Sequence, residues 1–154
     1  MRVLAVDIGT VRMGLAVSDA LAMTAQPLET RAGGSPRVMA RSVLDLVLSY
    51  EDAERPAASI ATVVIGHPVY LDGRASAMSE AARECARLLR AYLRQQLERR
   101  VDVVLQDERL TSVAAEKAML ATGASRRRRK QKRDQVAAQL ILQTYLDAHR
   151  PSTP

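Results

Sequence analysis

An aspartate, Asp7, occurs where a short apolar run ends and a tight, basic turn begins. Residues 3–6 are apolar, and Gly9-Thr10 separates them from a second apolar run. Glycine supplies the positive φ that a tight turn requires, so the two runs predict a β-hairpin. With Arg12 five residues after it, a carboxylate at this turn suits metal-assisted chemistry on phosphates. A strand-end aspartate on its own is more often a turn cap, but two later acidic sites favour the chemical interpretation.

Those two acidic sites also occupy the ends of predicted elements. Asp107 and Glu108 follow a predicted strand at 101–105, and Asp134 begins a helical pattern. Functional groups in open α/β sheets gather outside strand ends, and carboxylates together with substrate phosphates bind Mg²⁺ or Mn²⁺. Two such ions stabilise both the attacking water and the leaving oxygen of a phosphodiester. We therefore predict that Asp7, Asp107 and Asp134 are catalytic metal ligands.

Neighbouring residues along a strand point to opposite faces, so only one of Asp107 and Glu108 is expected to face the metal. We favour Asp107 and keep Glu108 as the alternative catalytic carboxylate. Arg12 is predicted to bind a substrate phosphate through its guanidinium fork, with a pairing to Asp19 as the alternative. Arg109 is a further candidate for substrate binding, or else it pairs with a carboxylate and locks its turn.

A cationic run at 126–133 dominates the charge of the chain, whose formal net charge is +6. Seven of its eight residues are cations: Arg126, Arg127, Arg128, Arg129, Lys130, Lys132 and Arg133. Like charges at this density repel, so the run predicts a mobile loop that binds nucleic acid with release of counterions. A solvated loop and a membrane-surface patch are the alternatives. The chain has no Phe or Trp, which argues against a membrane and favours phosphate contact over base reading.

The 154 residues, 47% of them hydrophobic, predict one domain over residues 1–149 with a flexible tail at 150–154. No window is apolar enough for a membrane span, and the N-terminal residues lack the pattern of a signal peptide. The single cysteine, Cys85, excludes an intramolecular disulfide and a cysteine-based zinc site. Its place in a helical apolar pattern predicts a buried, inert thiol. We expect a cytoplasmic protein.

Hydrophobic periodicity predicts a chain that begins with strands and then alternates strands and helices. Strands are expected near 3–6, 13–18, 27–30, 61–65 and 101–105. Helices are expected from Pro36, with Ser35 as its N-cap, across 79–98, from Thr111 and from Asp134. This order predicts an α/β fold with a mixed sheet flanked by helices.

Four motifs together resemble those of one known family. They are Asp7-x-Gly9-x-x-Arg12-x-Gly14 followed by Asp19, Gly66-x-Pro68-x-x-x-Asp72-Gly73, Asp107-Glu108-Arg109-Leu110-Thr111-Ser112 and Asp134-x-x-Ala137-Ala138-x-x-Ile141-Leu142-x-x-Tyr145-Leu146. In this order, over residues 2–147, they resemble the YqgF/RuvX family of the RNase H-like superfamily. These Holliday-junction-resolvase-like proteins are regarded as nucleases of pre-16S ribosomal RNA. The resemblance implies a five-stranded mixed sheet whose first three strands are antiparallel. It also implies an acidic, metal-dependent cleft near Asp7, Asp107 and Asp134.

These features favour a metal-dependent nuclease that processes the 5′ end of precursor 16S rRNA, with ribosomal particles as further partners. A Holliday-junction resolvase acting on four-way DNA is the first alternative, and it requires a dimer with two active sites. No exposed apolar stripe obliges dimerisation, so we expect a monomer or a weak homodimer. A non-catalytic RNA-binding assembly or transcription factor is the second alternative, and the acidic residues argue against it. His67 is expected to be an ordinary hydrogen-bonding residue rather than a catalytic base.

Overall fold

The computed structural model describes residues 1–67, 76–107 and 126–151, and the side chains of 126–134 lie outside the description. The elements follow the predicted order. They are β1 (Arg2–Asp7), β2 (Arg12–Ser18), β3 (Ala25–Pro27), β4 (Arg31–Ala32), α1 (Pro36–Ser49), a 3₁₀ turn (Pro56–Ala58), β5 (Ile60–His67), α2 (Ala77–Gln96), β6 (Asp102–Asp107) and α4 (Arg126–Ala148). The short helix expected from Thr111 falls outside the described residues.

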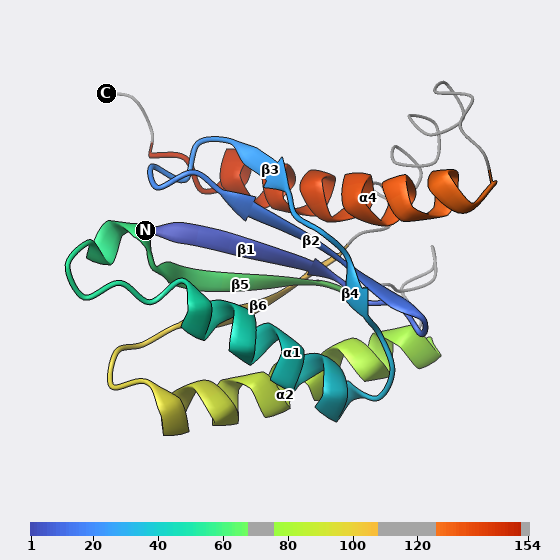
Figure 1. Ribbon diagram of the computed structural model, residues 1–154, viewed down its shortest axis with the longest axis horizontal. Helices are drawn as coiled ribbons and strands as arrows, with labels where there is room; N and C mark the ends of the chain where they lie inside the picture. Colours follow the sequence, from blue (N-terminus) through green and yellow to red (C-terminus); the bar gives the residue numbers. More distant parts are fainter. Residues whose placement is uncertain (68–75, 108–125, 152–154) are drawn as a thin grey trace.

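The strands form one mixed sheet in the order β3-β2-β1-β5-β6, with the short β4 paired to β2 (Figure 1). β1 pairs antiparallel with β2, and β2 with β3, whereas β5 and β6 are parallel to β1. The predicted mixed sheet with three antiparallel opening strands is therefore confirmed. The predicted strand at 27–30 is replaced by two shorter ones, β3 and β4, which pair with different parts of β2.

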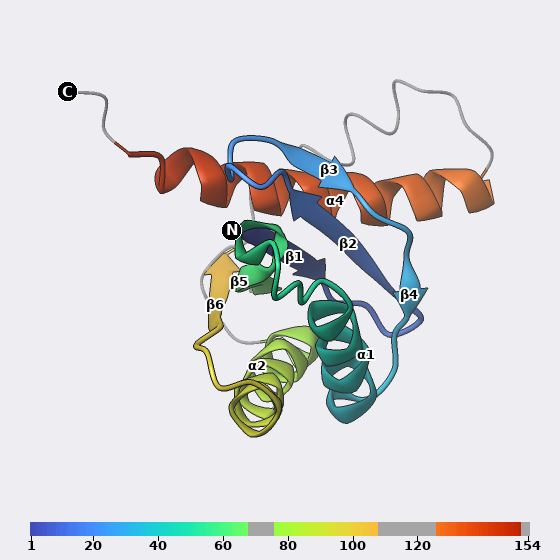
Figure 2. The same ribbon diagram turned by 60° about the vertical axis from the view of Figure 1, so that its left-hand side comes forward.

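Helices cover both faces of the sheet, α1 and α2 on one side and α4 on the other (Figure 2). Strand alternation divides the apolar side chains between these layers. On β1, Leu4 and Val6 belong to the core under α1 and α2. Val3 and Ala5 belong to the core under α4, with Ala138 as one of its helix residues. β1 is thus buried on both faces, as its continuous apolar run requires.

The starts of the two helices on the first face depend on serine caps. The hydroxyl of Ser35 accepts the N–H of Val38 at 3.2 Å, and Pro36 occupies the first turn, as predicted. Helix α2 begins at Ala77, two residues earlier than expected, because Ser76 accepts the N–H of Ser79 at 3.1 Å. On its buried face, Cys85 is the buried thiol that the sequence predicts, and burial raises its pKa to about 12, which disfavours the reactive thiolate.

The prediction that 126–133 is a loop and that the last helix begins at Asp134 is wrong. Helix α4 begins at Arg126 and continues to Ala148, so the cationic run forms its first turns. Arginine, lysine and glutamine have helix propensities close to that of alanine. The second half of α4 is anchored on the sheet, so the helix extends from a formed nucleus rather than having to create one. Repulsion between the like charges of residues 126–133 therefore does not prevent them from forming a helix.

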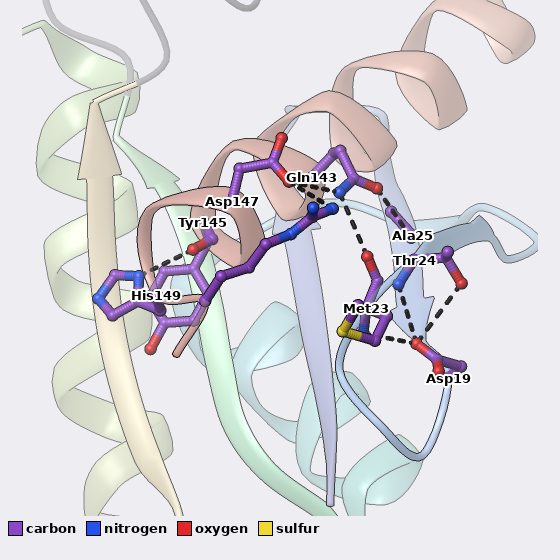
Figure 3. A network of polar contacts seen from close by, with 9 residues as sticks. Asp19, Met23, Thr24, Ala25, Gln143, Tyr145, Asp147 and His149 are labelled. Carbon is purple, nitrogen blue, oxygen red and sulfur yellow. Dashed lines mark hydrogen bonds and ion pairs between the residues drawn. The ribbon is translucent and has the colours of Figure 1, made fainter. Parts of the chain in front are cut away.

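Three glutamines at helical spacing attach α4 to strand β3 and the residues beside it. Gln143 accepts the N–H of Ala25 at 3.1 Å, and Gln139 donates to the carbonyl of Ala25 at 3.1 Å. Gln143 also donates to the carbonyl of Met23 and to Asp147 (Figure 3). Gln135 donates to the carbonyl of Leu28 at 3.3 Å. These bonds use backbone groups of a strand at the end of the sheet order that would otherwise be available to another chain.

The turn between β2 and β3 depends on Asp19. Its Oδ1 accepts the N–H groups of Met23 at 2.7 Å and Thr24 at 2.9 Å (Figure 3). Its Oδ2 accepts the N–H of Leu21 at 3.3 Å. Ala22, inside this turn, has a φ of 54°. The N–H groups of Thr24 and Met23 hold the pKa of Asp19 below its ordinary value. Asp19 therefore has a structural function in closing this turn.

None of the helices in the described part of the chain is long and apolar enough to cross a membrane.

We expect Asp19→Asn to lower stability at neutral pH and to change its dependence on acid. A carboxylate whose pKa is depressed by folding stabilises the protein above its unfolded value of 3.8, and this contribution is lost as the pH falls through the folded pKa. The difference in Tm between parent and variant should therefore shrink on acidification below 3.8. Thermal unfolding followed by circular dichroism measures it. Asp45→Asn, on the exposed side of α1, is the control, and an equal effect there would contradict the assignment.

Candidate active site

The three parallel strands end at one edge of the sheet, and each ends in a polar residue. Asp7 ends β1, His67 ends β5 and Asp107 ends β6. In the register, Val6 pairs with Ile65, Ile65 with Leu105, and His67 with Asp107. The Cα atoms of Asp7 and Asp107 are thus separated by two strand spacings, about 10 Å. The predicted gathering of acidic residues at one sheet edge holds for these two.

Strand alternation places Asp7 and Arg12 on the same side of that edge. Asp7 follows Val3 and Ala5, which pack under α4, and it pairs with Gly14 on β2. On β2, Arg12 is in phase with Gly14 and with Ala16, which also packs under α4. Both side chains are half-buried. A carboxylate and a guanidinium therefore share the α4 side of the sheet.

Helix α4 runs antiparallel to β1 and brings its acidic position to the same end of the sheet. Gln135 bonds to the carbonyl of Leu28, Leu28 donates to the carbonyl of Leu15, and Leu15 pairs with Val6. Position 134 is therefore level with the end of β1. It is also four residues before Ala138, on the helical face that packs on the sheet. The side chain of Asp134 lies outside the described residues.

His67 and Asp107 lie on the other side of the edge, toward α2. Nε2 of His67 and the hydroxyl of the buried Ser79 are 2.6 Å apart, which ties the end of β5 to the first turn of α2. Asp107 is in phase with Val103, which packs in the core under α1 and α2, whereas Gln106 donates to the carbonyl of Ile141 in α4. His67 is thus a hydrogen-bonding residue, as expected.

Among the residues whose side chains are described, no group of three or more His, Cys, Asp or Glu could hold a metal ion. Glu108 and Arg109 lie outside the described residues, as do the side chains of 126–134. Among the described side chains on the α4 side of the edge, the Asp7 carboxylate is the candidate metal ligand. Arg12 lies on the same side. Carboxylate oxygens are the ligands that Mg²⁺ and Mn²⁺ take. Asp7 therefore fits such an ion.

The alternative pairing of Arg12 with Asp19 is excluded by the fold. Arg12 begins β2 and Asp19 directly follows its last residue. A strand rises about 3.3 Å per residue, so the two Cα atoms are about 23 Å apart. Asp19 is committed to the turn at the opposite end of the sheet, and Arg12 is therefore assigned to the Asp7 end.

Two glycines allow the turn between Asp7 and Arg12 to be this tight. A Cβ on Gly9 would lie 2.3 Å from the carbonyl oxygen of Arg12. A Cβ on Gly33 would lie 2.2 Å from the carbonyl oxygen of Gly9 and 3.0 Å from the nitrogen of Arg12. Gly33 also donates its N–H to the carbonyl of Val11 at 2.9 Å. The expectation of a positive φ at Gly9 was wrong, because the glycine is required by close backbone approach.

Sequence reasoning missed several residues that support the site. The contact of Gly33 with the Gly9 turn joins segments that no local pattern connects. Ser79 was counted only as the start of a helix. The glutamines of α4 did carry a signal, since 135, 139 and 143 repeat at intervals of four and must lie on one helix face.

A sequence model of the family described as "RuvX: Holliday junction resolvase" matches residues 1–148. The chain belongs to the RuvX family. A relative from Myxococcus xanthus is 39% identical over 151 residues, covering 98% of this chain and 91% of that protein. One from Halalkalibacterium halodurans is 38% identical over 149 residues, covering 96% of each. Both carry the name "Putative pre-16S rRNA nuclease".

Solved structures place this RuvX-family chain in the expected fold. T. thermophilus RuvC in complex with a Holliday junction substrate superposes with a TM-score of 0.55 at 15% identity, over 97% of this chain and 96% of that one. The fowlpox virus Holliday junction resolvase gives 0.53 at 12% identity, over 96% and 99%. At these identities the likeness concerns the fold alone, and it confirms the RNase H-like architecture.

We expect Gly33→Ala to disturb the site by displacing the turn that joins Asp7 to Arg12. The added methyl overlaps backbone atoms that cannot rotate away, so the free energy of unfolding should fall by about 1–3 kcal/mol. Urea unfolding measures that loss, and nucleic-acid cleavage should fall further than the folded fraction accounts for. Ala32→Ser alters the exposed neighbour on the same segment and serves as control. Unchanged stability of Gly33→Ala would show that the turn has room to move.

Proposed function

We propose that this RuvX-family protein is a metal-dependent nuclease that hydrolyses phosphodiester bonds of precursor 16S rRNA, at its 5′ end. The supporting observation is that Asp7 and Arg12 share the α4 side of the sheet edge, with position 134 of α4 level with the end of β1. The names of the relatives support the RNA substrate. Family membership supports a phosphodiester hydrolase.

In this proposal Asp7 and Asp134 hold Mg²⁺ or Mn²⁺. The ion would supply charge stabilisation at the phosphate and activation of the attacking water. The sequence favours Asp107 over Glu108 as a further ligand, but Asp107 is in phase with Val103 and shares the α2 side with His67. We therefore favour Asp107 less than Glu108 in this proposal. Glu108 is then the preferred alternative. Comparing Asp107→Asn with Glu108→Gln decides between them.

Arg12 supplies a fixed positive charge beside Asp7. Its planar guanidinium donates two parallel hydrogen bonds to phosphate oxygens, a geometry that lysine lacks. During hydrolysis a bond forms between the water oxygen and phosphorus while the ester P–O bond breaks, and negative charge grows on the phosphate oxygens. A cation held in place before the reaction stabilises that charge without reorganisation. The half-buried position of Arg12 strengthens this effect by limiting solvent screening.

We expect Asp7→Asn to abolish cleavage while nucleic-acid binding survives or tightens. The amide is a poor ligand for the ion, and a negative charge facing the phosphate is removed, so the rate should fall at least about a hundredfold. The measurement is cleavage of matched precursor RNA and four-way-junction DNA in Mn²⁺, with and without chelator.

Asp45→Asn, on the exposed side of α1, is the matched control for this measurement and should cleave like the parent. Preferential cleavage of the junction would replace the RNA assignment with a resolvase. If Asp7→Asn, purified free of host nucleases, cleaves as fast as the parent, the nuclease assignment falls and a non-catalytic assembly or transcription factor takes its place.

The cationic first turns of α4 are proposed to bind nucleic-acid phosphates without regard to sequence. Replacing residues 126–129 by glutamine keeps helix propensity while removing four charges. Binding to all nucleic acids should weaken alike, and the slope of log affinity against log salt should fall by about 0.7 for each lost contact with a single strand. Fluorescence anisotropy across a salt series measures this. Loss confined to one sequence or one junction type would contradict it.

For a nuclease of precursor rRNA we further propose ribosomal particles as partners, a cytoplasmic location, and a monomeric or weakly dimeric state. Sedimentation of the purified protein with and without RNA tests the oligomeric state, because a stable dimer would favour the resolvase alternative.

A further inference from the structure

All four arginines of helix α2 lie on one flank of the helix. Arg83, Arg87, Arg90 and Arg94 follow each other at intervals of four, three and four residues. These intervals keep them within about 40° of one direction around the axis, and all four are exposed. We call this set the arginine stripe. It occupies about 16 Å of helix length, since each residue adds about 1.5 Å.

The arginine stripe lies on the side of α2 that faces β6, not on the side that faces α1. Arg90 donates to the carbonyl of Val103 in β6 at 2.8 Å, which fixes the direction of the flank. Figure 2 shows α2 between these two elements. The buried residues Ala86, Leu89 and Leu93 follow the adjoining face of the helix.

The C-terminal half of the stripe borders a concavity of about 620 Å³ at the end of α2 farthest from His67. Arg90, Arg94 and Arg100 line it, together with Glu98 and Asp102. Arg100 pairs with Asp102 at 2.6 Å.

Within the part of the chain that the structure describes, Arg94 makes no hydrogen bond or ion pair. Arg99, also in the wall, is held by Glu51 and by the carbonyl of Ile60, so its charge serves the fold.

Among the described residues, the N-terminal half of the stripe pairs only with acids one helical turn away. Arg83 pairs with Glu80 at 3.1 Å and Arg87 with Glu84 at 2.9 Å, each within one turn and exposed. Exposed ion pairs of this kind contribute little to stability because solvent screens them. Their arginines are therefore available to a phosphate at little cost.

Helix α2 begins at the candidate active site and leads away from it. The contact between His67 and Ser79 places its first turn at the end of β5. Arg83 is about 6 Å along the helix from Ser79, and Arg94 about 22 Å. A row of cations leading away from a catalytic edge matches a linear polyanion, and a strand of nucleic acid carries one charge about every 3.4 Å of helix rise. A single small anion would need only one of these positions.

From this geometry we propose that the arginine stripe is a second nucleic-acid surface, which binds the phosphate backbone of the strand as it leaves the catalytic edge. The stripe lies on the opposite side of the sheet from the cationic first turns of α4, so the two surfaces flank the edge. This inference rests on the proposed function for its choice of polyanion. It extends that function by predicting that substrates long enough to reach α2 bind more tightly than short ones.

The test measures binding in an Asp7→Asn background, so that cleavage does not interfere. Fluorescence anisotropy compares a short RNA with a long one, across a salt series, for Arg90→Gln/Arg94→Gln and for Arg94→Gln alone.

The controls separate charge from folding. Arg94→Gln keeps the bond from Arg90 to Val103, so a folding defect caused by loss of that bond does not affect it. Arg55→Gln/Arg150→Gln removes two exposed charges outside the stripe and is the matched control. Glu98→Gln removes a carboxylate from the concavity.

We expect the double variant to bind the long RNA several-fold more weakly, with a salt slope reduced by about 1.4, or 0.7 for each lost contact. Arg94→Gln should lose about half of this slope, and Glu98→Gln should tighten binding. Short-RNA binding should not change, and neither should kcat on a short substrate in protein that retains Asp7.

An unchanged salt slope for the long RNA, or an equal loss in the control, would overturn the proposal. Weaker binding of polyglutamate with unchanged RNA binding would assign the stripe to an acidic protein instead.

These outcomes are separable from those of the catalytic proposal. Loss of long-RNA binding in the stripe variants, measured with chelator present, supports the second surface even if Asp7→Asn leaves cleavage intact. Abolished cleavage in Asp7→Asn supports the nuclease even if the stripe variants bind normally.

Discussion

Burial of β1 on both faces determines the side of the sheet on which its last residue, Asp7, emerges. Val3 and Ala5 must face α4, and Leu4 and Val6 must face α1 and α2. A slip of one residue would exchange these faces, so that Leu4 and Val6 would enter the space packed around Val3 and Ala5, and Asp7 would turn toward α1 and α2. Asp7 therefore emerges on the α4 side. The same alternation in β6 sends Asp107 to the opposite side, although both residues end parallel strands at the same edge.

The second constraint is the attachment of α4. Apolar contacts from Ala138 and its neighbours bury one face of the helix, but such contacts are not directional and tolerate sliding. The bonds of Gln139 and Gln143 to the backbone of β3 are directional and set the helix at one level along the sheet. Because α4 is continuous from Arg126, the same bonds place its acidic position and its cationic turns relative to β1. The helix thus links the sheet core to the proposed substrate path.

Charge is distributed to match this architecture. The cationic first turns of α4 lie on one side of the sheet and the arginines of α2 on the other, while the proposed chemistry lies at the edge between them. Phosphate contacts of this kind position a nucleic acid without reading its sequence. The backbone that joins Asp7 to Arg12 is held in one conformation by Gly9 and Gly33, where two segments approach too closely for a Cβ atom.

The sequence by itself determined most of the order of strands and helices, the mixed α/β class, the N-cap at Ser35 and the burial of Cys85. Each depends on local periodicity, capping chemistry or composition, which are visible within a few residues. Only the tertiary structure decided which side of the sheet each polar residue faces and that α4 begins at Arg126. It also decided that Asp19 accepts hydrogen bonds within its own turn and does not pair with Arg12. These depend on contacts between segments far apart in the chain, such as Gly33 against Gly9 and Gln135 against Leu28. A local pattern contains no information about which distant backbone will supply the partner, because burial and strand pairing are properties of the assembled sheet.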